Sequence, residues 1–211
     1  MRAMSTKRYL IALFAAVLCI CAVAVRIWWV NAHAVQLPVE RYDEGQWLEI
    51  GAAFNYSNEE KMDGYAFRVN SVEVMTPNEY LRKYGKDDVR KVDRGNERTI
   101  LAVNLTMRNS DNTEGGIKSY LWKVVPASRS TMYSPDNELW SHAVKNTESL
   151  SMFSVVPGTE VTTVVPFRGL TDNDYGGSWS DMKREPIKDS RFEFVLTNLP
   201  VRKLIDMEAR G

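Results

Sequence analysis

The sequence predicts an all-β domain behind one N-terminal transmembrane helix, and the domain we expect is an antiparallel immunoglobulin-like β-sandwich with one short helix. Three observations lead to this class. They are an uncharged apolar run near the N-terminus, later segments in which apolar and polar residues alternate, and clusters of turn-forming residues between those segments. A partly open barrel is the alternative arrangement of the same strands.

The composition narrows the classes of protein. The chain has 211 residues, 44% of them hydrophobic, and its 27 basic residues balance 27 acidic ones. This mixture excludes collagen, a coiled coil and a disulfide-dense miniprotein. Without a basic excess, we expect no nucleic-acid partner. Both cysteines, Cys19 and Cys21, fall in the apolar run, so the remaining domain must be stabilised by its hydrophobic core.

The apolar run predicts a membrane anchor. Residues 9–30 supply the roughly 20 residues that a spanning helix needs. Tyr9 stands at the start of the run, and Arg26 near its end can extend its charge to the interface. Trp28 and Trp29 stand where an aromatic belt belongs. Because the basic residues cluster before the run, the positive-inside rule places the N-terminus in the cytoplasm.

The expected organisation has four parts, a basic cytoplasmic tail, a transmembrane signal-anchor helix, a linker and an extracytoplasmic domain. Their bounds are residues 1–8, 9–30, 31–45 and 46–211. The alternative is a signal peptide that is cleaved near Ala34, because Ala32-His33-Ala34 has the small-x-small form of a cleavage site. The length of the apolar run favours a retained anchor, and in both cases the domain leaves the cytoplasm.

Seven segments are predicted as strands because apolar and polar residues alternate in them or because they are rich in β-formers. They are residues 46–56, 65–75, 99–108, 118–126, 148–156, 160–168 and 191–197. In the second of these the apolar face changes sides after Val69, which predicts a β-bulge.

One short helix is predicted within this β domain. Thr76 and Glu79 have the spacing of a capping box, and Pro77 occupies the first helical position. Gly85 is expected to end the helix.

A family resemblance rests on turn and strand-edge segments. These segments are residues 56–60, 156–160, 166–167 and 198–203. Through them the chain resembles uncharacterised immunoglobulin-like domains of membrane-anchored Gram-positive cell-surface proteins, over most of residues 42–207. The resemblance implies an anchored extracytoplasmic fold of this type, with no assigned activity and no site residues.

The sequence offers little catalytic chemistry. It contains two histidines, His33 and His142, and no nucleophile elbow, zinc-helix, P-loop or dinucleotide motif. Ser141 precedes His142, but sequence neighbours on a strand point to opposite sides. We expect no enzyme. The alternative is an envelope hydrolase with its site near His142, which requires His142, Ser141 and an acid to meet in one cleft.

A calcium site is considered and not expected. Asp172 and Asp174 stand at the first and third positions of a calcium-loop pattern. Gly176 and Lys183 occupy the fifth and twelfth positions, which need oxygen ligands. We therefore expect no metal and no other cofactor.

The long connection at residues 169–190 is the predicted partner-contact region. Tyr175 and Trp179 are residue types that act as binding anchors, and Asp172 and Asp174 could orient a basic partner. The alternative is that these aromatic side chains pack onto the edge of the domain.

Together these features predict a single-pass, membrane-anchored extracytoplasmic binding domain without catalytic activity. Its expected partners are the lipid bilayer, through residues 9–30, and either an envelope protein or a component of the cell wall or host. A small-solute carrier would need a large apolar pocket, which nothing in the strands suggests. The expected location is the cell membrane.

Overall fold

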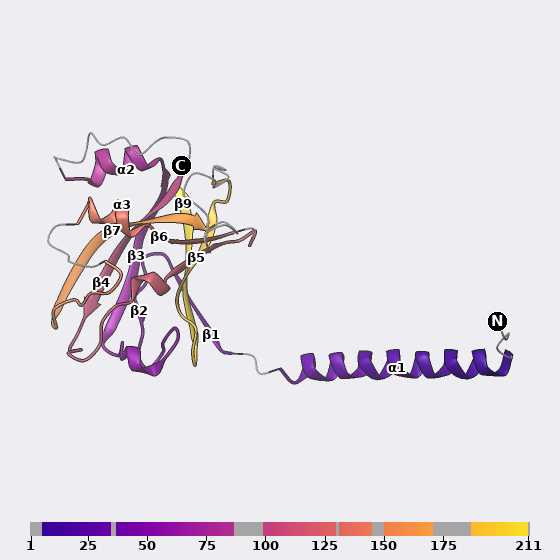
Figure 1. Cartoon of the computed structure of the whole chain (residues 1–211). Helices are drawn as coiled ribbons and strands as arrows, with labels where there is room; N and C mark the ends of the chain where they lie inside the picture. The colour runs from indigo at the N-terminus through magenta and orange to yellow at the C-terminus, as the bar shows by residue number, and fades with distance from the viewer. Residues whose placement is uncertain are drawn as a thin grey trace. The chain divides into compact units, whose positions relative to one another are not determined.

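The computed structural model describes residues 6–34, 37–86, 99–129, 131–144, 150–170 and 187–210. The chain forms two compact units, residues 1–36 and 37–211. The first unit contains the helix α1 (Thr6–Ala32), and the second contains all the strands (Figure 1).

Helix α1 has the length and composition of a membrane span. Its apolar stretch, Tyr9–Ala32, is 24 residues long with a mean hydropathy of 2.8. At about 1.5 Å per residue, such a stretch exceeds the roughly 30 Å of a bilayer's hydrocarbon core. A signal sequence near an N-terminus has the same properties.

The second unit is a closed, mixed β-barrel. Its strands are β1 (Val39–Asp43), β2 (Leu48–Glu49), β3 (Tyr65–Met75), β4 (Ile100–Asn109), β5 (Lys123–Pro126), β6 (Met132–Pro135), β7 (Thr159–Leu170), β8 (Arg191–Thr197) and β9 (Arg202–Arg210). They are ordered β1-β9-β8-β5-β6-β7-β4-β3-β2, and a further pairing joins β9 to β3. That pairing is parallel, with Val72 opposite Ala209 and Glu73 opposite Arg210. It closes the seven strands from β3 to β9 into a barrel and leaves β1 and β2 outside the ring.

The expected immunoglobulin-like sandwich is therefore wrong. Alternation in a strand decides which side chains face the core, but it does not decide which strands pair. Here the C-terminal strand β9 pairs in parallel with both β1 and β3, so the sheet closes on itself instead of folding into two layers. Of the expected strands, residues 46–56 contain the two-residue β2 and one isolated bridge, Phe54 to Leu199. The described part of residues 148–156 contributes one isolated bridge, Phe153 to Ile117.

Two local predictions are confirmed. The register of β3 against β4 shifts between Val69 and Ser71, which is the expected bulge. The helix α2 (Pro77–Tyr84) begins with a capping box in which the Thr76 side chain accepts a hydrogen bond from the Glu79 backbone N–H.

Aromatic side chains fill the barrel. Trp122 makes edge-to-face contacts with Phe67 and Phe194, at ring-centroid distances of 5.8 and 5.6 Å. Trp140 lies 6.3 Å from Trp122 and donates its indole N–H to the Thr163 hydroxyl at 3.0 Å. These aromatic side chains therefore form the centre of the hydrophobic core inside the barrel.

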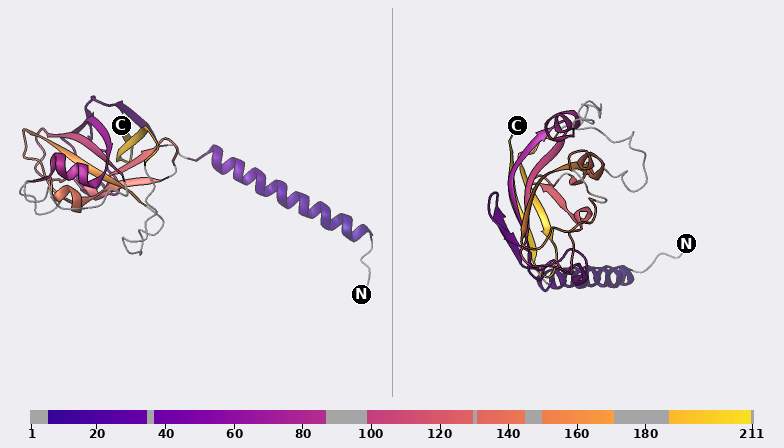
Figure 2. Two further views of the ribbon diagram at one scale, coloured as in Figure 1. Left: turned by 90° about the horizontal axis from the view of Figure 1, so that it is seen from above. Right: turned by 90° about the vertical axis from the view of Figure 1, so that its left-hand side faces the viewer.

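Helix α2 covers one part of the outside of the barrel (Figure 2). Its Tyr80 and Leu81 pack with Ile100 and Ala102 of β4 and with Leu139 of the short helix α3 (Asn137–Ser141). The Tyr80 hydroxyl donates to the Val164 carbonyl at 2.6 Å, and burial raises the pKa of that phenol.

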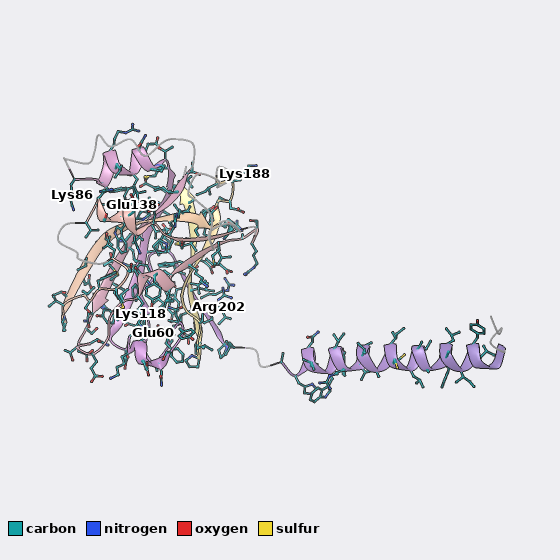
Figure 3. All side chains as sticks on the ribbon, viewed as in Figure 1. Glu60, Lys86, Lys118, Glu138, Lys188 and Arg202 are labelled. Atoms are coloured by element: carbon teal, nitrogen blue, oxygen red, sulfur yellow. The ribbon has the colours of Figure 1, made fainter. Side chains whose placement is uncertain are left out.

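The barrel has two ends that differ in their connections. We call the end where β1 begins, which also holds the 3₁₀ helix η1 (Asn58–Glu60), the entry end. The opposite end, where β9 ends and α2 begins, is the far end. Glu60 and Lys118 lie toward the entry end, whereas Lys86 and Glu138 lie toward the far end (Figure 3).

Candidate functional site

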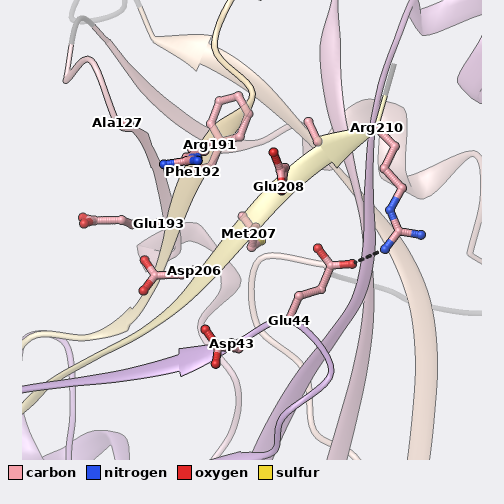
Figure 4. Close-up of a pocket in the computed structure, with 11 residues that line it drawn as sticks. Asp43, Glu44, Ala127, Arg191, Phe192, Glu193, Asp206, Met207, Glu208 and Arg210 are labelled. Carbon is pink, nitrogen blue, oxygen red and sulfur yellow. Dashed lines mark hydrogen bonds and ion pairs between the residues drawn. The ribbon is translucent and has the colours of Figure 1, made fainter.

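An open groove of about 950 Å³ lies on the outside of the barrel where β1, β8 and β9 run side by side (Figure 4). Its lining residues are Asp43, Glu44, Ala127, Arg191, Phe192, Glu193, Asp206, Met207, Glu208, Ala209 and Arg210. Strand alternation explains this lining, since Phe192 and Met207 are buried in the core while their neighbours carry charge outward.

Arg41 is not a lining residue, but it bridges two carboxylates of the groove. Glu193 and Asp206 stand opposite each other on β8 and β9, so their two carboxylates would repel each other. The Arg41 guanidinium lies between them and donates to Glu193 Oε1 at 2.8 Å and to Asp206 Oδ1 at 2.9 Å. The hydrogen bond to Glu193 contributes most to raising the pKa of Arg41. Arg129 reaches Glu193 from the other side, at 3.3 Å.

The remaining groove charges are only partly paired. Arg210 bonds Glu44 at 3.1 Å. Asp43 and Glu208 have no side-chain partner among the described residues. The lining contains five acidic and two basic residues, so the groove is acidic even after Arg41 and Arg129 are added. No cluster suited to a metal ion occurs within the described ranges.

A second polar surface lies on the outer faces of β3 and β4. The guanidinium carbons of Arg68 and Arg108 lie 4.5 and 4.4 Å from the centre of the Trp47 ring. Arg108 is also paired with Glu49 at 2.6 Å. These contacts hold both arginines against the sheet.

Asn70, at the β3 bulge, connects this surface into a network. Its amide nitrogen donates to Asn104 Oδ1 at 2.9 Å and to Thr106 Oγ1 at 2.8 Å. Its carbonyl oxygen accepts from Arg68 Nε at 3.2 Å, and Thr106 shares a hydrogen bond of 2.9 Å with Thr162. The bulge thus turns a residue that has no ladder partner into the centre of a side-chain network.

The hydrolase alternative requires Ser141 and His142 to act together. Ser141 lies at the end of α3, and its hydroxyl donates to the Glu138 carbonyl at 2.7 Å. His142 forms the cap of the same helix, and its carbonyl accepts from the Lys86 N–H at 3.0 Å. Neither residue lines the groove.

The other predicted site residues fall in two places. Tyr9, Arg26, Trp28 and Trp29 all lie on α1, and the Trp29 ring stacks on His33 with a centroid distance of 4.6 Å. Tyr175, Trp179, Asp172 and Asp174 lie outside the described residues.

Sequence reasoning missed both the groove and the Asn70 network. The available signal for the groove was the alternation of charged and buried residues in Arg191–Thr197 and Arg202–Arg210. Such alternation is also what an ordinary solvent-exposed strand face shows.

The fold and its surfaces define a class of protein with one apolar N-terminal helix followed by a closed β-barrel with polar outer surfaces. Residues 39–203 match a family described as a domain of unknown function (DUF5028), and the chain belongs to this family. The match begins at β1 and ends at the start of β9, so it covers β1 to β8 but not most of the closing strand. No curated protein and no solved structure matches the chain. The Gram-positive host stays a prediction.

Proposed function

We propose that this protein is a single-pass, membrane-anchored domain held outside the cytoplasm, and that it binds a partner without catalysing a reaction. The observation that carries the proposal is the contrast between a barrel filled with aromatic side chains and a concave, charged groove on its outside. Among the described residues the interior is filled with buried apolar side chains, which favours binding on the outer surface.

The groove favours a basic segment of another envelope protein as its occupant. Asp43 and Glu208 are available to a cationic side chain, and the carboxylates on β8 and β9 are already fixed by Arg41. A surface whose charges are held in place by neighbours loses little side-chain entropy when a partner binds. Its acidic excess would speed association and fix the orientation of a basic segment more than it would strengthen binding.

Site-specific photo-cross-linking tests the groove. A photo-reactive amino acid in place of Glu208 should yield one dominant protein adduct in native membranes, weakened by Asp43→Lys. The same photo-reactive residue in place of the exposed Glu59, on η1, is the matched control and should not yield that adduct. Equal adducts at the two positions, or indifference to Asp43→Lys, would assign binding to another surface.

Anchoring and topology need a separate experiment. Protease added to intact cells should remove a C-terminal tag, while a fragment that contains α1 stays in the membrane fraction. Release of the domain with a new N-terminus near residue 35 would instead identify a cleaved signal peptide. Protection of the tag would place the domain in the cytoplasm and reverse the proposed topology.

A further inference from the structure

The exposed large apolar side chains of the barrel unit are distributed unevenly between its two ends. Six of the eight in the described residues lie at strand ends or loops of the entry end, and the other two, Tyr120 and Met152, lie on connections between strands. The six are Leu37, Val39, Tyr56, Val156, Val161 and Leu199. Among the described residues of α2, α3 and the far strand ends there are none.

Three of these residues lie on neighbouring segments of the entry end. Phe54 and Leu199 form an isolated β-bridge, and Tyr56 follows two residues after Phe54. The Pro38 carbonyl accepts from the Arg202 N–H at 2.9 Å, which places Leu37 next to the same loop. We call Leu37, Tyr56, Leu199 and the exposed Pro200 the entry rim.

The loop that carries Tyr56 is held in place by hydrogen bonds, although Tyr56 is 85% exposed. The buried Glu60 carboxylate accepts from the backbone N–H groups of Asn55 and Tyr56 at 3.0 and 2.8 Å. The Asn55 side chain donates to the Leu196 carbonyl at 2.6 Å and accepts from Asn198 at 2.9 Å. A tyrosine exposed on a fixed loop needs no ordering before it meets another surface.

The covalent chain limits how far the entry rim can be from a membrane that contains α1. The helix ends at Ala32, and Leu37 follows five residues later. Five residues span at most about 18 Å when fully extended. Trp28 and Trp29 are residue types that concentrate at the interface, so the chain leaves the hydrocarbon region within the last turn or two of α1.

We propose that the entry rim rests on the headgroup layer of the membrane in which α1 is anchored. This inference depends on the proposed anchoring. Tyrosine suits the interface because its ring is apolar and its hydroxyl is polar. The proposed contact is apolar and not electrostatic, because the exposed charged residues that follow Tyr56 in sequence are Glu59, Lys61 and Asp63, and Lys61 is already paired with Glu114. In this arrangement the far end is the end of the barrel away from the bilayer.

Site-specific fluorescence quenching in proteoliposomes tests this surface on the full chain. Because Cys19 and Cys21 are the two cysteines, replacing both with serine allows one label to be placed at a chosen position. Labels go at Glu59→Cys on the entry end and at the exposed Arg82→Cys on α2, in phosphatidylcholine vesicles with a quencher on the lipid headgroup. The Glu59 label should be quenched and the Arg82 label should not, with no change in high salt.

Two further arms separate the possible failures. In a chain that keeps Cys19 alone, a label there should be quenched by lipids with a quencher in the acyl chain. If it is not, the helix is not inserted, and both the anchoring and the rim proposals fail. If it is, but the Glu59 and Arg82 labels are quenched alike, anchoring stands and the rim proposal is wrong.

The last arm tests whether apolar contact, and not the short tether alone, holds the rim at the membrane. Tyr56→Asp combined with Leu199→Asp should lower quenching of the Glu59 label to the level of the Arg82 label. Circular dichroism must show that the double variant remains folded, and Tyr56→Phe should keep the quenching. Unchanged quenching in the folded aspartate variant would mean that the short linker alone keeps the Glu59 label near the membrane, and it would overturn the proposed contact.

Discussion

The inner and outer faces of the β8–β9 strand pair are stabilised in different ways. Inside, Phe194 lies 5.5 Å from Phe167 and 5.6 Å from Trp122, and each of these rings is buried. Outside, Glu193 and Asp206 stand opposite each other, and the Arg41 guanidinium bonds to both and offsets their repulsion. The inner face is stabilised by removing apolar area from water, which is worth about 25 cal/mol per Å². The ion pairs of the outer face contribute less to stability, because water would solvate the same charges in the unfolded chain.

The largest effect should follow from emptying the centre of the inner face. Trp122→Ala removes the ring that contacts Phe67, Phe194 and Trp140, and should lower the free energy of unfolding by about 3–5 kcal/mol. Urea unfolding measures this change. The matched control is the half-exposed Tyr120, whose replacement by alanine should cost less than about 0.5 kcal/mol. Similar losses for both variants would mean that Trp122 is not the centre of the core.

A smaller effect is expected from the Asn70 network, which lies outside but is partly buried. Asn70→Ala removes two donated hydrogen bonds and one accepted bond, and should cost about 1–2 kcal/mol of unfolding free energy. The neighbouring half-buried Ser71 provides the control, because Ser71→Ala changes the same stretch of strand without touching the network. If the two variants lose the same stability, the bulge and not the side-chain network is responsible.

The sequence predicted the parts of this fold that depend on local patterns. The β3 bulge follows from a change of apolar face within eleven residues, and the α2 cap follows from residue types three positions apart. Barrel closure depends on pairing between β3 and β9, in which Val72 stands opposite Ala209, 137 residues later in the sequence. Alternation in one strand contains no information about such a partner.

The strand β9 was not among the strands predicted from the sequence. Leu204 and Ile205 are both buried, although consecutive residues of a strand face opposite sides. The two buried neighbours break the simple alternation by which a strand is predicted. The groove was missed for a related reason, since it exists only once β1, β8 and β9 have assembled.

The ion pairs of the groove should contribute less than the Asn70 network. Arg41 and Asp206 have side chains that are 49% and 41% exposed. A double-mutant cycle with Arg41→Ala and Asp206→Asn should therefore give a coupling of about 0.5–1 kcal/mol, which 1 M salt should reduce. The more exposed pair Lys61 and Glu114 is the control and should show weaker coupling. Equal coupling in the two pairs would show that the groove does not hold Arg41 more firmly than open surface does.

The smallest effect should come from the Glu79 carboxylate at the start of α2, and it should depend on pH. Hydrogen bonds from Thr76, first from its backbone N–H and then from its hydroxyl, lower the pKa of Glu79 in the folded protein. A carboxyl group with a lowered folded pKa adds stability above its unfolded pKa, and this contribution is lost as the pH falls through the folded pKa. Glu79→Gln should therefore be less stable than the natural protein at pH 7, and the difference should disappear in acid. Urea midpoints measured from neutral pH downward test this expectation, and Thr76→Ser should keep the natural pH dependence because serine also caps helices. A stability difference that stays constant from pH 7 into acid would mean that the ionised carboxylate is not what stabilises the start of α2.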